Sequence, residues 1–234
     1  MLEDGSVYEG TARGDFKETA CEIVFNTSMT GYVEILTDPS YAGQGVVMTY
    51  PMIGNYGISR EDFESERLQP SAFIVHELSS DPSNFRCTDT IENLLKEYNI
   101  PCISGVDTRA VVKKLRESGT MRGVLTSDIG DRERLMDVIK SFRQIDLVGS
   151  VTAKQTKVYG EENTGAEIAL MDFGTKRNII NNLVKRNCIV TVYPSFTSAD
   201  EIIKTSPDGI MLSNGPGDPS ECVDIIKEIK KLYD

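Results

Sequence analysis

The 234-residue sequence predicts a mixed α/β protein with two differently organised parts. Over residues 1–152, short apolar runs alternate irregularly with helical stretches and turn residues, which is typical of an α+β domain. Over residues 167–234, continuous apolar runs alternate regularly with amphipathic segments, as expected for βαβ units around a parallel sheet. Residues 153–166 are polar, contain glycine and lack periodicity, so they are predicted to be a linker.

In the first part, runs rich in β-branched and apolar residues predict strands, and apolar residues at helical spacing predict helices. The expected strands are Cys21–Phe25, Val46–Thr49, Ala72–His76 and Gly123–Thr126. The expected helices are Asp89–Tyr98, Thr108–Ser118 and Asp131–Phe142. Asp107 should cap the second helix because its carboxylate can accept a backbone N–H, and Gly119 should end that helix.

In the second part, three strands should alternate with three helices. The expected strands are Ile168–Phe173, Ile189–Tyr193 and Ile210–Ser213. The expected helices are Lys176–Arg186, Ser198–Lys204 and Ser220–Leu232. Three strands are fewer than a doubly wound sheet normally has, and the last helix has no following strand. The expectation is an incomplete parallel α/β domain, in a chain that is a fragment or an unusually short relative of a larger protein.

Composition argues against several kinds of function. A net charge of −11 disfavours binding to nucleic acid or to an anionic membrane, since both would repel the chain. An apolar stretch of about 18 residues and a secretory leader are both missing from the sequence, so neither membrane insertion nor secretion is expected. The five cysteines are scattered, which fits free thiols in a reducing cytoplasm. With only one histidine in the sequence, a zinc site of cysteine and histidine ligands is not expected.

A glycine-proline turn, residues 215–219, follows the last predicted strand. Open α/β sheets bind ligands at such strand ends, and the glycines leave backbone N–H groups uncovered for an oxyanion or polar ligand. The turn also fits a plain strand-to-helix connection with Pro219 in the first helical turn. A dinucleotide site is disfavoured because Ser220 stands where a third glycine is needed. A nucleotide-binding regulatory protein would need a phosphate loop of the GxxxxGK[ST] type, and the sequence contains none.

Small polar residues gather in three stretches of the first part, at residues 26–32, 37–41 and 49–57. Loops of this composition are commonly plain surface connections between strands. Their hydroxyl groups and glycines would equally suit a site that hydrogen-bonds a small polar ligand.

Several runs together resemble the small, glutamine-hydrolysing subunit of carbamoyl-phosphate synthase. They are Phe25–Tyr32, Glu34–Tyr41, Thr49–Pro51, Ile53–Asn55, Ser83–Arg86, Asp107–Arg109, Asp172–Gly174, Lys176–Ile179 and Ser213–Pro219. They occur in order over nearly the whole chain and include a first domain that other class I glutamine amidotransferases lack. The glycine-proline turn alone would fit any class I glutamine amidotransferase, such as the anthranilate or GMP synthase type.

The resemblance implies a small-subunit N-terminal domain over residues 1–152 and part of a flavodoxin-like class I amidotransferase domain over residues 167–234. It implies a cytoplasmic ligase in which the small subunit hydrolyses L-glutamine. Ammonia then passes through a tunnel to a large subunit that forms a heterodimer with it. That subunit uses bicarbonate and ATP with magnesium to make carbamoyl phosphate for arginine and pyrimidine synthesis. No cofactor is expected on this chain itself.

The resemblance also implies that Ser40, Gly215 and Gly217 bind glutamine, with the Gly215 N–H as oxyanion donor. The cysteine, histidine and glutamate of the family's triad are expected beyond Asp234, so no catalytic residue is assigned here. Alternatives are a non-catalytic module that docks on the large subunit, and another class I glutamine amidotransferase.

A resident cysteine is a weak candidate for the nucleophile. Cys188 opens an apolar strand, where a small side chain packs in the core. Cys222 lies at the start of the last helix, where a thiol pKa can be lowered. It lacks a strand-to-helix elbow, however, and only His76, at a strand end of the first part, could activate it. The chain alone is therefore expected not to hydrolyse glutamine.

Overall fold

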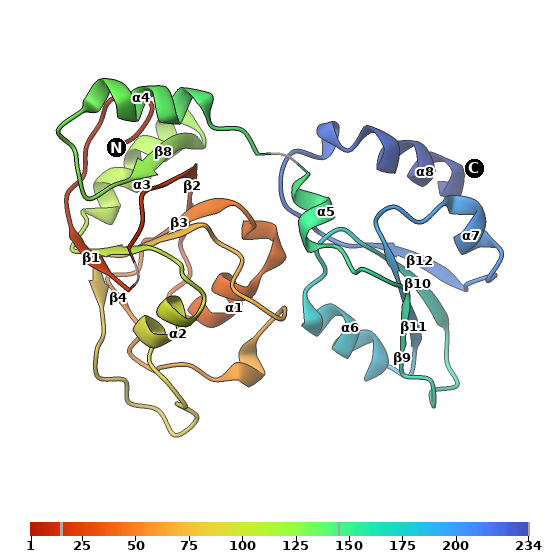
Figure 1. Cartoon of the computed structure of the whole chain (residues 1–234). Helices are drawn as coiled ribbons and strands as arrows, with labels where there is room; N and C mark the ends of the chain where they lie inside the picture. Colours follow the sequence, from red (N-terminus) through yellow and green to blue (C-terminus); the bar gives the residue numbers. More distant parts are fainter. Residues whose placement is uncertain (15, 145, 234) are drawn as a thin grey trace. The chain divides into compact units, whose positions relative to one another are not determined.

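The computed structural model describes residues 1–14, 16–144 and 146–233. The chain divides into two compact units, Met1–Gln144 and Ile145–Asp234, and each is described by itself (Figure 1). Both units combine helices with sheets, so the predicted mixed α/β class is confirmed. In the described ranges, every helix is too short or too polar to cross a lipid bilayer.

A six-stranded sheet forms the centre of the first unit, in the order β1-β7-β5-β3-β2-β8. Its strands are β1 (Thr11–Arg13), β2 (Thr19–Asn26), β3 (Gln44–Met48), β5 (Ala72–Ile74), β7 (Cys102–Ser104) and β8 (Met121–Leu125). The four central strands are parallel, and the edge strands β1 and β8 pair antiparallel. A separate parallel pair consists of β4 (Met52–Ile53) and β6 (Glu77–Leu78).

Helices cover both faces of this sheet because neighbouring residues of a strand point to opposite sides. Val46 and Val47 of β3 show this, since they belong to different apolar clusters. The helices are α1 (Tyr32–Thr37), α2 (Ile91–Glu97), α3 (Thr108–Ser118) and α4 (Arg132–Ser141), with 3-10 turns η1 (Pro39–Tyr41) and η2 (Arg60–Asp62). Residues of α1 and α2 pack in the cluster of Val46, and residues of α3 pack in the cluster of Val47.

Side-chain caps fix where these helices begin. The carboxylate of Asp107 accepts the N–H of Ala110 at 3.0 Å, and Gly119 ends α3 with a φ of 83°. Both predictions for this helix are confirmed. The hydroxyl of Thr90 starts α2 in the same way, because it accepts the N–H of Asn93 at 3.2 Å.

The second unit contains a four-stranded sheet in the order β12-β10-β11-β9. Its strands are β9 (Lys157–Tyr159), β10 (Glu167–Asp172), β11 (Ile189–Pro194) and β12 (Gly209–Leu212). Its helices are α5 (Leu147–Val151), α6 (Arg177–Val184), α7 (Ala199–Ile203) and α8 (Val223–Tyr233), with the 3-10 turn η3 (Pro219–Glu221) before α8. The helix α6 packs on one face, against Leu170 and Val190, while α7 and α8 pack on the other, against Ala169 and Met171 (Figure 1).

The structure differs from the predicted linker at residues 153–166. Three of these residues, Lys157–Tyr159, form β9, which pairs antiparallel with β11 at the edge of the second sheet. The helix α5 precedes β9 and also belongs to the second unit. A short, solvent-exposed edge strand carries no apolar alternation, so the polar composition of this segment indicated a loop. Where the two family domains meet along the sequence stays a prediction.

Two thiols should be unreactive toward thiol reagents in the folded protein. Cys21 and Cys102 are fully buried, and burial raises the pKa of each thiol to about 12, so almost no thiolate forms at neutral pH. A thiol reagent such as Ellman's reagent should label at most the other three cysteines before unfolding, and all five afterwards. Cys21→Ala should leave the native count unchanged, whereas Cys222→Ser should lower it by one. Rapid labelling of Cys21 in the native protein would contradict this burial.

The cap of α3 should contribute measurably to stability. Asp107→Ala removes the acceptor of the Ala110 N–H, so the free energy of unfolding should fall by about 1 kcal/mol. Asp137→Ala, at an exposed position inside α4, is the matched control and should change it by less than about 0.5 kcal/mol. Urea unfolding followed by circular dichroism measures both. Equal effects of the two substitutions would argue against the cap.

Candidate functional site

The glycine-proline turn begins where β12 ends and lies beside the end of β10. These strands are parallel neighbours with Met171 paired to Leu212, so both leave the sheet at the same edge. The N–H of Ser213 donates to the carbonyl oxygen of Met171 at 3.2 Å. The hydroxyl of Ser213 accepts the N–H of Phe173 at 2.9 Å. Ser213 therefore holds the two strand ends together.

Both glycines of the turn are required by the backbone, for different reasons. A Cβ at Gly215 would lie 2.3 Å from the carbonyl oxygen of Phe173, so any larger residue would displace the turn. Gly217 has a φ of 80°, which L-residues with a side chain adopt only with strain. In the described part of the chain, neither glycine donates its N–H to an acceptor. The turn therefore presents two open donors at the strand end.

Asp218 and Pro219 connect the turn to α8. The carboxylate of Asp218 accepts the N–H of Ser220 at 2.8 Å, and this bond together with the Ser220 hydroxyl holds the pKa of Asp218 below its ordinary value. The bond and Pro219 favour the short 3-10 turn η3, so α8 starts at Val223, later than the predicted start at Ser220.

The buried carboxylate of Asp172 organises the neighbouring strand end. Its Oδ1 accepts the N–H groups of Gly174 and Thr175 at 3.0 and 2.7 Å, and its Oδ2 accepts the N–H of Ala153 at 2.7 Å. The hydroxyl of Thr175 is buried and has no hydrogen-bond partner among the described residues. A buried hydroxyl without a partner indicates a place for a water molecule or a ligand atom.

Thr152 extends this network to the next strand. Its hydroxyl donates to the carbonyl oxygen of Asp172 and accepts the N–H of Ser195 at 2.8 Å. All three residues are buried, with 5 to 7% of their surface exposed. The ends of β10 and β11 are thus fixed by buried hydrogen bonds, and the glycine turn lies against a rigid base.

None of the arrangements around the cysteines resembles an activated nucleophile in the described ranges. Cys222 precedes α8, yet its thiol pKa is raised, first by burial and then by Glu221, Asp146 and Asp218. His76 has its Nδ1 3.1 Å from the carbonyl oxygen of Val106. The described residues also contain no group of three or more His, Cys, Asp or Glu side chains suited to hold a metal ion.

Ser40 lies in the first unit, in the short turn η1 that follows α1. The carboxylate of Asp38 accepts the Ser40 N–H at 2.9 Å, and Pro39 favours the 3-10 conformation. The backbone at Ser40 is therefore fixed, and its side chain is half-buried. Gly215 and Gly217 share one turn of the second unit, while Ser40 belongs to the first unit.

The first unit also contains a polar pocket of about 290 Å³. Loops that are distant in the sequence meet there, and its lining residues are Thr30, Gly31, Glu34, Tyr56, Ser59, Asp62, Asn84 and Arg86. The guanidinium of Arg86 donates to Asp62 at 2.6 Å, to Glu61 at 3.2 Å and to Ser59 at 3.3 Å. Burial, aided by nearby carboxylates, raises the pKa of Glu34, so this side chain takes up a proton more readily than an exposed glutamate.

Two stacked tyrosines, of which Tyr56 lines this pocket, hold the start of α1. The rings of Tyr32 and Tyr56 are 4.1 Å apart with an interplanar angle of 19°. The hydroxyl of Tyr56 accepts the N–H of Gly31 at 2.6 Å and that of Tyr32 at 3.2 Å. The hydroxyl of Tyr32 donates to the carbonyl oxygen of Gly57 at 2.8 Å.

Sequence reasoning named residues 26–32 and 49–57 as stretches that would suit a polar ligand site, and these contribute Thr30, Gly31 and Tyr56 to the pocket. It assigned only Ser40 as a site residue in the first unit and did not single out Glu34 or Arg86. Glu34 and Arg86 lie inside runs that carried the resemblance, which was the available signal. The residues that line the pocket come together only in the folded chain. Arg86 and Asp62, for example, are 24 residues apart in the sequence.

Comparison with known proteins gives two consistent family matches. Residues 1–125 match the family described as carbamoyl-phosphate synthase small chain, CPSase domain, and residues 169–234 match glutamine amidotransferase class-I.

Among curated relatives, the carbamoyl phosphate synthase small chain of Clostridium perfringens is 47% identical over 99% of this chain and 66% of its own length. The small chain of Listeria monocytogenes serotype 4b is 45% identical over 99% of this chain and 64% of its own length. That of Bacillus cereus is 46% identical, again over 99% of this chain, and 63% of its own length is covered.

The chain therefore spans just under two thirds of the length of these relatives. The first family match covers more than half of the chain, and the second includes the glycine-proline turn. On this evidence the chain belongs to the carbamoyl-phosphate synthase small chain family.

Proposed function

We propose that this chain binds L-glutamine as part of the glutamine-hydrolysing small subunit of a carbamoyl-phosphate synthase. The observation that carries the proposal is the pair of open N–H groups at Gly215 and Gly217, at the end of a parallel strand, in a chain of this family. Open backbone donors at a strand end suit the carboxamide of glutamine, which must be held by hydrogen bonds as it reacts.

In the proposed reaction a cysteine thiolate attacks the carboxamide carbon of glutamine, and the C–N bond breaks as the leaving nitrogen takes up a proton and departs as ammonia. Water then hydrolyses the resulting thioester, which releases glutamate and restores the thiol. Negative charge then develops on the carboxamide oxygen, and the Gly215 N–H is the proposed donor that stabilises it. The N–H of Gly217 and the side chain of Ser40 are the proposed contacts that orient glutamine. Because Phe173 fixes the position of Gly215, that donor needs no rearrangement when charge appears.

The attacking thiolate is not assigned to any cysteine of this chain. Burial raises the thiol pKa of Cys21, Cys102 and Cys222, and the one histidine belongs to the first unit beside Val106. The triad expected after Asp234 stays a prediction. The chain by itself is therefore proposed to bind glutamine without hydrolysing it.

The proposed partner is the large subunit of carbamoyl-phosphate synthase, which would take up the ammonia. That subunit would use bicarbonate and ATP with magnesium to form carbamoyl phosphate, and this chain itself is proposed to need no cofactor. The relatives' common name, small chain, supports such a partner. The five free thiols fit the proposed cytoplasmic location.

A second candidate function is docking on the large subunit without binding glutamine. The observation favouring it is Phe85, which is 96% exposed next to Arg86. Exposed aromatic and arginine side chains are enriched at protein interfaces.

Gly215→Ala should weaken glutamine binding at least tenfold, as measured by isothermal titration calorimetry. The added methyl group collides with Phe173, so the turn must move and its N–H groups lose their alignment. Gly209→Ala is the matched control in β12, because its Cβ would be 3.4 Å from its nearest neighbour, and it should leave affinity within about twofold. Equal affinities for both variants would contradict the assigned role of the turn. A wild-type chain that does not bind glutamine yet binds the large subunit would favour the docking function.

The chain alone should release no ammonia from glutamine above the uncatalysed blank. The reason is that its thiols have no base within hydrogen-bond reach among the described residues. Coupled detection with glutamate dehydrogenase measures the ammonia. Release that disappears in Cys222→Ser would overturn the proposal and assign the nucleophile to that residue.

A further inference from the structure

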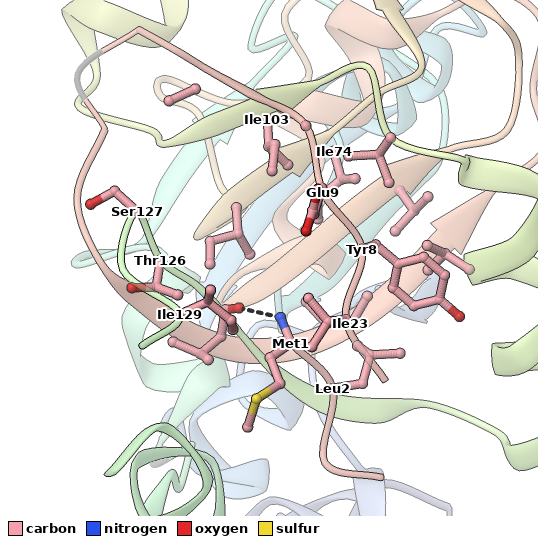
Figure 2. Close-up of a pocket in the computed structure, with 18 of the residues that line it drawn as sticks. Met1, Leu2, Tyr8, Glu9, Ile23, Ile74, Ile103, Thr126, Ser127 and Ile129 are labelled. Carbon is pink, nitrogen blue, oxygen red and sulfur yellow. Dashed lines mark hydrogen bonds between the residues drawn. The ribbon is translucent and has the colours of Figure 1, made fainter. Parts of the chain in front are cut away.

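A cavity of about 420 Å³ in the first unit belongs to the apolar packing of that unit (Figure 2). Ile23 and Ile74 line it, and only 3 and 6% of their surface is exposed. The Met1 amino group, which also lines it, already donates to the carbonyl oxygen of Val124 at 2.9 Å. A more specific polar arrangement surrounds the hydroxyl of Ser213, at a strand end of the second unit.

The Ser213 hydroxyl makes two hydrogen bonds, one as acceptor and one as donor. Its oxygen accepts the N–H of Phe173 at 2.9 Å, so its own proton is left to donate elsewhere. That proton is donated to the carbonyl oxygen of Asn214, 2.7 Å away. The first bond joins the end of β12 to the end of β10. The second acts inside the glycine-proline turn, on the peptide group between Asn214 and Gly215.

The peptide group between Asn214 and Gly215 carries the proposed oxyanion donor. It is planar and trans, so its C=O and N–H bonds point in opposite directions. Because Ser213 holds the carbonyl oxygen, the Gly215 N–H points away from the Ser213 hydroxyl. On that side it has no acceptor among the described residues. The bond from Ser213 and the open donor are therefore at opposite ends of one rigid group.

The glycine at position 215 makes such a restraint necessary. A side chain is excluded there, because a Cβ would lie 2.3 Å from the carbonyl oxygen of Phe173. Glycine, however, adopts positive and negative φ about equally well, so the peptide group that precedes it can turn over at little steric cost. After such a flip the Asn214 carbonyl would face the ligand in place of the N–H. Its oxygen would then repel the negative charge that develops on the carboxamide oxygen of glutamine.

We propose that Ser213 is a positioning residue for glutamine hydrolysis. Its hydroxyl holds the Asn214–Gly215 peptide group in the orientation in which the Gly215 N–H faces the carboxamide oxygen, and Ser213 itself does not touch glutamine. The inference rests on the proposed function for the identity of the ligand. The orientation of the peptide group, by contrast, is a property of this chain alone and is measured without any ligand.

Residual dipolar couplings of backbone N–H groups, measured on the whole chain, report the orientation of the Gly215 N–H relative to those of β10 and β12. Ser213→Ala removes the hydroxyl but retains the backbone bond to Met171, so β12 should stay paired while the Gly215 coupling changes. Ser213→Thr retains a hydroxyl on Cβ and should keep the wild-type value. Ser198→Ala is the matched control, because that hydroxyl caps α7 through the N–H of Glu201, and it should leave the Gly215 coupling unchanged. An unchanged coupling in Ser213→Ala would overturn the proposal.

Isothermal titration calorimetry with L-glutamine tests the consequence for the ligand. Because the hydroxyl contributes one hydrogen bond of ordinary strength to the orientation, Ser213→Ala should weaken binding about fivefold. Ser213→Thr and Ser198→Ala should bind within about twofold of the wild type. Wild-type affinity in Ser213→Ala would contradict the positioning role. A wild-type chain that does not bind glutamine would instead overturn the proposed function, and the Gly215 coupling would then decide by itself whether Ser213 orients the peptide group.

Discussion

The close approach of Gly215 to the carbonyl group of Phe173 is the constraint on which the second unit's candidate site depends. It is possible only because β10 and β12 are adjacent parallel strands in a fixed register, with Met171 opposite Leu212. That register brings two connections to one edge of the sheet, and Ser213 joins them through bonds to Met171 and Phe173. Sheet pairing, rather than any property of the loop alone, places the open N–H groups.

In the first unit, polar contacts between segments distant in the sequence position the residues of the polar pocket. The start of α1 has no side-chain cap of its own, because Gly31 stands at that position in the left-handed conformation. Tyr56 replaces the missing cap from 24 residues away in sequence, and its ring stacks on Tyr32. Arg86 is held in turn by Asp62 and Ser59. The polar pocket is therefore assembled by contacts between loops.

Elements with a long apolar run or a clear cap and stop residue could be predicted from the sequence. The strand at Ile189 and the helix α3 follow from a long apolar run and from the Asp107 cap and Gly119 stop. The helix α1 escaped prediction because it has six residues and takes its cap from Tyr56, which no local rule reveals. The strand β9 escaped because an exposed edge strand needs no apolar residues.

The same limit applies to the candidate sites. The glycine turn was visible because glycine and proline restrict the backbone directly, and Ser40 was assigned only through the family resemblance. The fit of Gly215 against Phe173, and the meeting of Arg86 with Asp62, depend on which segments become neighbours in the fold. Pairing between distant segments is a property of the whole chain, so sequence periodicity does not contain it.

The stacked tyrosines give the first unit a built-in optical probe. The chain contains no tryptophan, so its near-ultraviolet circular dichroism comes mainly from nine tyrosines and eight phenylalanines. Two rings held 4.1 Å apart couple their electronic transitions, and one of them borders the polar pocket. A molecule that enters this pocket and tilts Tyr56 would thereby change the spectrum of the unlabelled protein.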